Sequence, residues 1–441
     1  MERGGISGQP GQVAITGRIF KGLGLVLGGK AGAGLISLVY LILAARALGP
    51  KDYGILVLVH GYVAAVVGIV EFPAWQAIVR YGAEASAQDA PHRLARLLRF
   101  GTTIELLGGA AAIVAAMALA PFVGPHLGWP PETVAFAIPY SFAALGSVRS
   151  APAGYLQLID RFDLIGLHNM AQPLVRLIGA ALAWWLGWGL KGFLCAWLAA
   201  ALAEFAILWG MGLICALNRL GPILRHPERG SAVKDNPGIW RFLVASNADV
   251  TLSELAGRVA PLIVGWVLGP TMAGLFAVAQ RATVIIAQPA QILGNTAYAQ
   301  LARMVAAGEG GAPLRRTLMR VVGIALMAAV PVVLLVALFP TPIVTLLAGS
   351  AYRAAGGLMV MLVVARMIAV IGPPCSAALS ALGHPALSMT ANLFASLVFL
   401  PALPLLLHQA GLPGAGIQAI GQALLASALL AGLVWRRSLR R

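Results

Sequence analysis

Charged residues are scarce in this sequence. Asp, Glu, Lys and Arg make up 10% of the 441 residues, whereas a soluble protein carries about 25%. With 59% hydrophobic residues and a mean hydropathy of +0.86, the composition excludes an ordinary soluble domain and indicates a polytopic membrane protein. In such a chain the net charge of +16 is loop charge that faces anionic lipid and the cytoplasm, so we expect no nucleic acid partner.

Cysteine is also scarce, and no pattern of catalytic residues is present. Cys195, Cys215 and Cys375 lie in or at the edge of apolar runs, without metal-ligand spacing or an obvious disulfide partner. The stretch GLVLGGKA nearly matches a nucleotide-binding loop, but Ala31 replaces the Ser or Thr that would hold magnesium, and no strand precedes it. No external loop exceeds about 14 residues, which leaves no room for an external catalytic domain. We therefore expect a protein that is not an enzyme and has no cofactor and no metal site.

Long apolar runs dominate the sequence. Many exceed the roughly 20 residues that a helix needs to cross about 30 Å of hydrocarbon. They predict an all-α integral membrane protein with twelve transmembrane helices. The expected spans are 23–47, 54–79, 100–123, 134–157, 164–187, 192–216, 241–268, 272–300, 318–340, 354–381, 386–407 and 413–435.

The basic residues between the spans predict the orientation. On one side lie 21 Lys and Arg, and on the other side lie four. The richer side comprises the N-terminus, Arg161, the loops 80–99, 217–241 and 300–320, and the C-terminal tail. Since cytoplasmic loops carry the excess of Lys and Arg, both termini are predicted to be cytoplasmic.

A short loop occurs twice in the chain. LGPKDYG at 48–54 and LGPTMAG at 268–274 match at four of seven positions with an offset of 220, and each lies between two apolar runs. A weaker repeat, APAGYLQL at 151–158 and PCSAALSA at 374–381, ends the fourth span of each half. Six spans precede and six follow the polar linker 218–240. We therefore predict two six-helix lobes, 1–217 and 241–441, related by a parallel pseudo-twofold repeat around a central cavity.

Five stretches in register carry a resemblance to a known family. LAARALGPKDYGILVLV, EFPAWQAIVRYGAEA, LIVGWVLGPTMAGLFAVAQRA, AYAQLARM and LLAGSAYRAAGGLMVMLVVAR together resemble the polysaccharide and oligosaccharide-lipid flippases. These Wzx-type transporters belong to the multidrug/oligosaccharidyl-lipid/polysaccharide exporter superfamily. The resemblance implies alternating access in the bacterial inner membrane and an undecaprenyl-diphosphate-linked glycan as substrate. Two departures concern ion coupling: Pro73 stands where the family usually has Gly, and GRVAPLIV lacks an acidic residue common in the seventh helix.

Ionisable side chains inside the spans are the candidate site residues, because each costs about 2.5–3.5 kcal/mol on insertion scales. At 100° per residue, Asn247, Glu254 and Arg258 share one face of the span 241–268, with Asp249 on the other side. A second polar stripe follows the span 272–300, and a third follows the span 164–187. Their members are Arg281, Gln288 and Asn295, and His168, Gln172 and Arg176.

We expect a cavity lined by the first, second, seventh and eighth spans, with the fifth as a further candidate. Its cations would bind the diphosphate, for which the Arg guanidinium offers forked donors. The predicted substrate-binding residues are Lys30, Arg258, Arg281, Arg176, Gln288, Asn295 and Asn247. The candidates for carrying a coupling ion are Glu71, Glu254 and Asp249. An alternative stays open, in which Glu254 and Arg258, spaced i,i+4, neutralise each other and stabilise helix packing.

Three further intramembrane charges are considered. For Arg149 and Arg366, a cavity role and a packing role are equally open. Glu105, about one turn from the cytoplasmic face, is expected to extend its carboxylate to the interface.

A cation-coupled multidrug exporter of the same superfamily is an alternative function, and a membrane glycan polymerase or ligase is a more distant one. The expected partners are the lipid-linked glycan, membrane lipids, and glycosyltransferases or a polymerase of the same pathway.

Overall fold

The computed structural model describes residues 10–71, 73–225, 230–281, 283, 301, 303–305 and 311–438, without the side chains of 10–31, 225, 248–256 and 385. Every regular element among these residues is a helix, as the sequence predicts. Seven helical stretches of the described chain are long and apolar enough to cross a membrane. The arrangement of twelve spans in two lobes stays a prediction.

The chain folds into two compact units that are discontinuous in sequence. The first comprises Met1–Leu43, Ile69–Ala118 and Ile138–Ala248, and the second comprises Ala44–Gly68, Leu119–Ala137 and Asp249–Arg441. The unit boundaries fall within helices rather than in the linker 218–240. The predicted lobe boundaries therefore stay a prediction.

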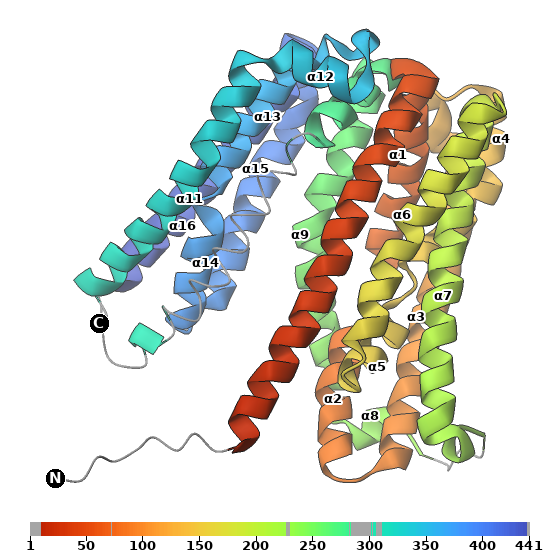
Figure 1. The fold of residues 1–441 in the computed structure, drawn as a ribbon, viewed down its shortest axis with the longest axis vertical. Coiled ribbons are helices and arrows are strands. Elements are labelled where there is room, and N and C mark those ends of the chain that lie inside the picture. Colours follow the sequence, from red (N-terminus) through yellow and green to blue (C-terminus); the bar gives the residue numbers. More distant parts are fainter. Residues whose placement is uncertain are drawn as a thin grey trace. The chain divides into compact units, whose positions relative to one another are not determined.

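The first half of the chain forms eight α-helices and one 3-10 helix (Figure 1). Within the first unit, α6 packs along α7, and α5 contacts α2, α6 and α7. The elements are α1 (Pro10–Val70), α2 (Trp75–Ala87), α3 (Pro91–His126), α4 (Pro131–Tyr140), η1 (Ser141–Ser147), α5 (Ser150–Leu158), α6 (Phe162–Trp185), α7 (Gly189–Arg225) and α8 (Ala232–Asp235).

The second half contributes the larger part of the second unit. There α16 packs against α13, α14 and α15, and a helix over residues 270–281 follows α9. The elements are α9 (Ile239–Leu268), α11 (Ala312–Leu338), α12 (Pro340–Ala348), η2 (Ser350–Tyr352), α13 (Ala355–Ala369), α14 (Gly372–Ala381), α15 (Pro385–Ala410) and α16 (Pro413–Ser438).

Three predicted spans are broken rather than continuous. The span 54–79 is interrupted between the end of α1 at Val70 and the start of α2 at Trp75, where Pro73 has no N–H to donate to a helix hydrogen bond. The span 134–157 is interrupted between η1 and α5, and the span 354–381 between α13 and α14. The last two breaks precede the weaker repeat, at 151–158 and 374–381, so the two copies share a local feature that the sequence pattern did not reveal.

Two predicted loops are largely helical. The segment 80–99 belongs to α2 and α3 except for residues 88–90, and the segment 217–241 contains the end of α7, α8 and the start of α9. Their polar composition had suggested loops. A helix that leaves the bilayer can instead continue in water with its polar face solvated.

The two copies of the repeated loop contact each other through their backbones. An added Cβ on Gly54 would overlap the carbonyl oxygen of Pro270, and an added Cβ on Gly274 would overlap that of Pro50. The two contacts are equivalent, because Gly54 and Gly274, like Pro50 and Pro270, are separated by the repeat offset of 220 positions. Gly49 and Gly269 have φ of 68° and 85°, a conformation that glycine adopts without steric cost. The repeat is thus a reciprocal helix contact.

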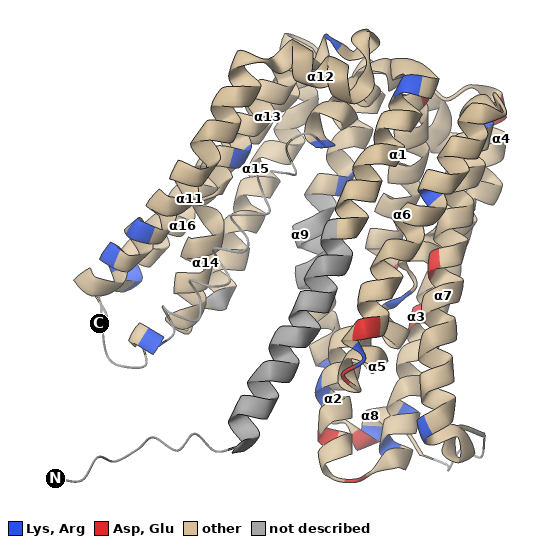
Figure 2. Ribbon diagram, in the orientation of Figure 1, with Lys and Arg blue, Asp and Glu red and all other residues tan. Residues whose placement is uncertain are grey.

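Side-chain contacts join some of the basic connecting segments within each unit. In the first unit, Arg93 donates to Asn236, and Arg96 forms an ion pair with Asp235 at 2.5 Å, which joins the segments 80–99 and 217–241. In the second unit, the Arg315 guanidinium lies 4.0 Å from the Trp435 ring centre, near the tail. Figure 2 shows Lys and Arg gathered at these ends of α2, α3, α8, α11 and α16. Which face is cytoplasmic stays a prediction.

Candidate functional site

Arg258 lies on the face of α9 that packs against the second part of α1, within the second unit. An added Cβ on Gly61 would lie 3.7 Å from Leu262, and one on Gly68 would lie 2.7 Å from Arg258 Nη1. Arg258 Nη1 donates a hydrogen bond of 2.9 Å to the carbonyl oxygen of Ala64. The missing side chain of Gly68 therefore leaves the space that the guanidinium occupies. The predicted pairing of Arg258 with Glu254 falls on a side chain outside the described residues.

Arg176 is enclosed inside the first unit. It is 5% exposed, and its Nη1 lies 3.3 Å from the Tyr40 hydroxyl. The guanidinium carbon lies 5.8 Å from the Tyr40 ring centre and 5.3 Å from that of Trp197. Rings at this distance stabilise a cation through their negative faces. The Arg176 side chain is thus held between α1 and α7. Its role in substrate binding stays a prediction.

Near Arg176, α6 and α7 share a buried polar cluster. His168 Nε2 lies 3.3 Å from the carbonyl oxygen of Glu204, and Glu204, itself 4% exposed, forms an ion pair with Arg149. His168 and Arg176 both belong to the predicted polar stripe on α6, and both contact residues of α7. The stripe exists, but these two members face a neighbouring helix of the same unit.

The other predicted residues are only partly described. Asn247 is 5% exposed, and its Nδ2 has no hydrogen-bond partner within the described part of the chain. Glu71 is half-buried directly after α1, and Arg281 is exposed at the end of the helix 270–281. Gln288, Asn295 and the side chains of Lys30, Asp249 and Glu254 lie outside the described residues. Their placement in a central cavity stays a prediction.

The expectation for Glu105 is wrong. Its side chain is fully buried rather than extended to the interface, and its two carboxylate oxygens accept hydrogen bonds from the backbone N–H groups of Ser150 and Ala151. These N–H groups begin α5, where the first turn of a helix leaves donors without an intrahelical partner. Glu105 therefore satisfies the start of α5 after the break in the fourth predicted span. The sequence analysis missed this because it treated that span as one continuous helix.

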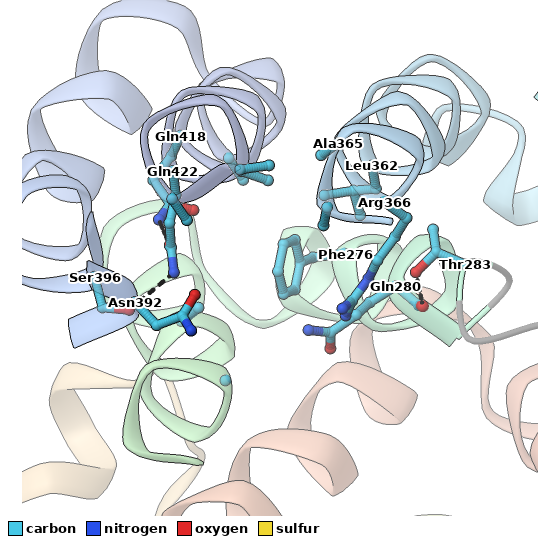
Figure 3. A pocket seen from close by; sticks show the side chains of 17 residues that line it. Phe276, Gln280, Thr283, Leu362, Ala365, Arg366, Asn392, Ser396, Gln418 and Gln422 are labelled. Carbon is cyan, nitrogen blue, oxygen red and sulfur yellow. Dashed lines mark hydrogen bonds between the residues drawn. The ribbon is translucent and has the colours of Figure 1, made fainter. Parts of the chain in front are cut away.

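The second unit contains a polar cavity that the sequence analysis did not identify. Its volume is about 360 Å³, and side chains from α9, the helix 270–281, α13, α15 and α16 line it. In Figure 3, Arg366 and Gln280 lie on one side, and Asn392, Ser396 and Gln422 lie on the other. A signal was present in the sequence, since Asn392 and Ser396, like Gln418 and Gln422, are spaced i,i+4 and so share a helix face. Of these lining residues, Arg366 alone was among the intramembrane charges noted in the sequence.

Hydrogen bonds hold one wall of this cavity. Gln418 Nε2 donates to Gln422 Oε1 at 2.7 Å, and Gln422 Nε2 donates to Ser396 Oγ at 3.0 Å. Asn392 Nδ2 donates to the carbonyl oxygen of Ser388 at 3.0 Å. The bond from Gln422 to Ser396 joins α16 to α15, and together the three bonds position the amide groups of this wall.

Solved structures of low sequence identity share this fold. An inward-closed structure of the lipid II flippase MurJ gives a TM-score of 0.68 at 13% identity, covering 94% of this chain and 89% of that one. An inward-facing multidrug resistance transporter of the MATE family in the MOP superfamily gives 0.66 at 16% identity, covering 95% and 94%. The chain therefore has the helical membrane transporter fold of MATE proteins and MurJ.

Sequence comparison gives a narrower relationship. The inner membrane protein YghQ of Escherichia coli (strain K12) is 28% identical over 278 residues, which cover 61% of this chain and 76% of that protein. Residues 19–298 match the family described as polysaccharide biosynthesis protein. Together with the apolar helices, these matches identify an integral membrane protein, and the chain belongs to the polysaccharide biosynthesis protein family.

Proposed function

We propose that this protein flips undecaprenyl-diphosphate-linked oligosaccharide or polysaccharide units from the cytoplasmic to the periplasmic leaflet by alternating access. The observation that carries the proposal is the family match over residues 19–298. The fold alone does not separate the candidates, since a lipid flippase and a multidrug transporter have TM-scores of 0.68 and 0.66.

The cations predicted inside the membrane supply the chemistry. Arg258 and Arg281, with Lys30, would bind the diphosphate, and Asn247, Gln288, Asn295 and Arg176 would contribute further donors. Arg258 supports this role because a hydrogen bond of 2.9 Å to the carbonyl oxygen of Ala64 positions its guanidinium. A guanidinium has five N–H donors, so such a group can bind phosphate oxygens while it is positioned by a carbonyl.

Energy would come from an ion gradient or from the substrate's own gradient. Glu71, Glu254 and Asp249 are the proposed carriers of a coupling ion, and this assignment rests on the sequence. We further propose a bacterial inner-membrane location with both termini cytoplasmic, two six-helix lobes, and glycosyltransferases or a polymerase of the same pathway as partners. The reciprocal contact between the repeated loops supports the parallel repeat.

The test is complementation of a strain that lacks the gene. Arg258→Ala and Arg281→Ala should each abolish surface glycan and cause lipid-linked glycan to accumulate in the inner leaflet, with protein abundance unchanged. Arg316→Ala is the matched control, because Arg316 is an exposed arginine on α11. Normal surface glycan in both single variants contradicts the proposed site.

A drug-susceptibility assay separates the alternative. A cation-coupled multidrug exporter would restore drug resistance to cells without their main exporters, whereas a glycan flippase would not. Resistance without any change in lipid-linked glycan would overturn the proposed function in favour of drug export.

A further inference from the structure

The polar cavity of the second unit has an unusual charge balance for a membrane interior. Among the 17 described residues that line it, Arg366 is the one with a formal charge, and none is Asp or Glu. The other polar members are three glutamines, Asn392, Ser396 and Thr283. A cavity with one fixed positive charge and neutral polar walls is suited to an anion.

Arg366 lies deep along its span. It is eleven residues after the start of α13 at Ala355, which is about 16 Å along a helix that rises 1.5 Å per residue. That distance is half of the roughly 30 Å hydrocarbon thickness. An arginine at mid-membrane is costly, so such residues usually face a cavity and have a partner of opposite charge.

No carboxylate supplies that partner within the described chain, where no Asp or Glu lies within ion-pair distance of Arg366. Its side chain remains exposed. Figure 3 shows the Arg366 side chain on the same side of the cavity as Gln280 and facing away from its own helix. Glu254, whose side chain is outside the described residues, is three positions before the lining residue Gly257, and the experiment below tests it as a competing partner.

The opposite wall is pre-organised for hydrogen bonding. The chain of bonds from Gln418 to Gln422 to Ser396 fixes both amides, so little side-chain entropy remains to be lost when a ligand binds. Amides and hydroxyls both donate and accept, which suits oxyanion oxygens and sugar hydroxyls. Arginine adds a planar fork that matches a carboxylate or a phosphate group.

We propose that this cavity binds an oxyanion, a carboxylate or phosphate group, with Arg366 as its charge partner. The volume of about 360 Å³ is near the lower end of the range for small-molecule pockets, about 300–1,000 Å³. It therefore suits one small anion or one sugar that carries such a group. None of the described lining residues is among those proposed above for the diphosphate, and binding at this cavity is measured without transport.

The experiment uses the full chain, purified and reconstituted in nanodiscs. Equilibrium binding of radiolabelled inorganic phosphate and of glucose 6-phosphate is measured, with glucose as the neutral probe. Wild type should bind both phosphates and not glucose. Arg366→Gln should weaken binding at least about tenfold, as expected for losing a hydrogen bond to a charged group. Arg316→Gln should leave it unchanged.

The two phosphate probes distinguish the source of the group. Tighter binding of glucose 6-phosphate identifies an oxyanion carried on a sugar, whereas equal or tighter binding of inorganic phosphate identifies a free anion. Gln422→Leu removes a wall donor without changing charge and should weaken both by a smaller factor, which keeps the test available if Arg366→Gln folds poorly.

Two results would overturn the inference. The first is that wild type does not bind phosphate, or that wild type and Arg366→Gln bind it with equal affinity. The second is that Arg366→Gln lowers the Tm, that Glu254→Gln/Arg366→Gln restores it, and that wild type binds no phosphate. Arg366 would then form an internal ion pair with Glu254.

Discussion

The carbonyl oxygen of Pro270 occupies the space where a side chain on Gly54 would lie, and the carbonyl oxygen of Pro50 does the same at Gly274. These contacts are between backbones, so neither partner can move aside as a flexible side chain would. The two helix starts can approach this closely only because both positions are glycine.

Gly54→Ala and Gly274→Ala should therefore each destabilise the protein. Inserting a methyl group into a packed contact costs about 1–3 kcal/mol, and a backbone obstacle favours the upper part of that range. Thermal unfolding in detergent should show a lowered Tm for both variants. Gly210→Ala is the control, because an added Cβ there has nothing within 4 Å. If Gly54→Ala unfolds at the same temperature as Gly210→Ala, the close contact is refuted.

Glu105→Ala should destabilise more than Glu105→Gln. The alanine variant leaves the backbone N–H groups of Ser150 and Ala151 buried without their acceptor, at about 1–3 kcal/mol for each unsatisfied group. The glutamine variant retains one acceptor oxygen. Thermal unfolding of both variants beside wild type measures the order, and an equal loss in the two would count against a capping role.

Arg149 and Glu204 should be energetically coupled. Arg149→Met leaves a carboxylate that is 4% exposed without this cation, and the cost should be below the roughly 3–5 kcal/mol of a fully buried pair, because the Arg149 side chain is 53% exposed. Adding Glu204→Gln removes the buried charge and should recover part of the loss. A double-mutant cycle on the unfolding temperature should give a non-additive term, whereas strictly additive effects would show that the pair contributes nothing.

Asn247→Ala should separate function from stability. The Asn247 amide is buried, and its Nδ2 has no hydrogen-bond partner among the described residues. Removing this Nδ2 breaks no hydrogen bond to the described part of the chain, so the Tm should change little. We expect surface glycan to fall while abundance stays normal. Asn169→Ala is the matched control, since Asn169 Nδ2 is also buried without a partner but lies outside the proposed site. Equal export in both variants would remove Asn247 from the site.

Gly68→Ala should reduce export through Arg258. The added Cβ would lie 2.7 Å from Arg258 Nη1, so the guanidinium must shift and lose its bond to Ala64. Because the obstacle is the end of a flexible side chain, folding should be affected little. Export assays on Gly68→Ala, with Gly34→Ala as the control where nothing lies within 4 Å, measure the effect. A lowered Tm with full export would instead assign Arg258 to packing.

The helical class was predictable because long apolar runs admit one solution in a bilayer, where backbone groups must be satisfied within the segment. The breaks were less predictable. Pro73 is a local signal that stops a helix, yet the break before Ser150 depends on Glu105, which is 45 positions away in the chain. A pattern read along one helix does not contain such a contact.

The candidate site shows the same limit. Periodicity placed His168 and Arg176 on one face of α6, and both contact α7, but it does not say what a polar face meets. The stripe on α6 meets Glu204 and Trp197 of α7, and Arg258 meets Ala64 and Gly68 of α1. The polar cavity was missed because its walls come from five helices, each of which contributes at most two polar residues to it.

The reciprocal loop contact makes this part of the chain resemble a homodimer whose subunits have been joined into one polypeptide. In a true homodimer, each residue beside the symmetry axis meets the same surface of its partner, so one substitution always changes both sides. Here Thr271, Met272 and Ala273 take the positions equivalent to Lys51, Asp52 and Tyr53, although the glycines that permit the approach are present in both copies. Joining the copies has thus allowed the two sides of the axis to carry different charge while retaining the same backbone contact.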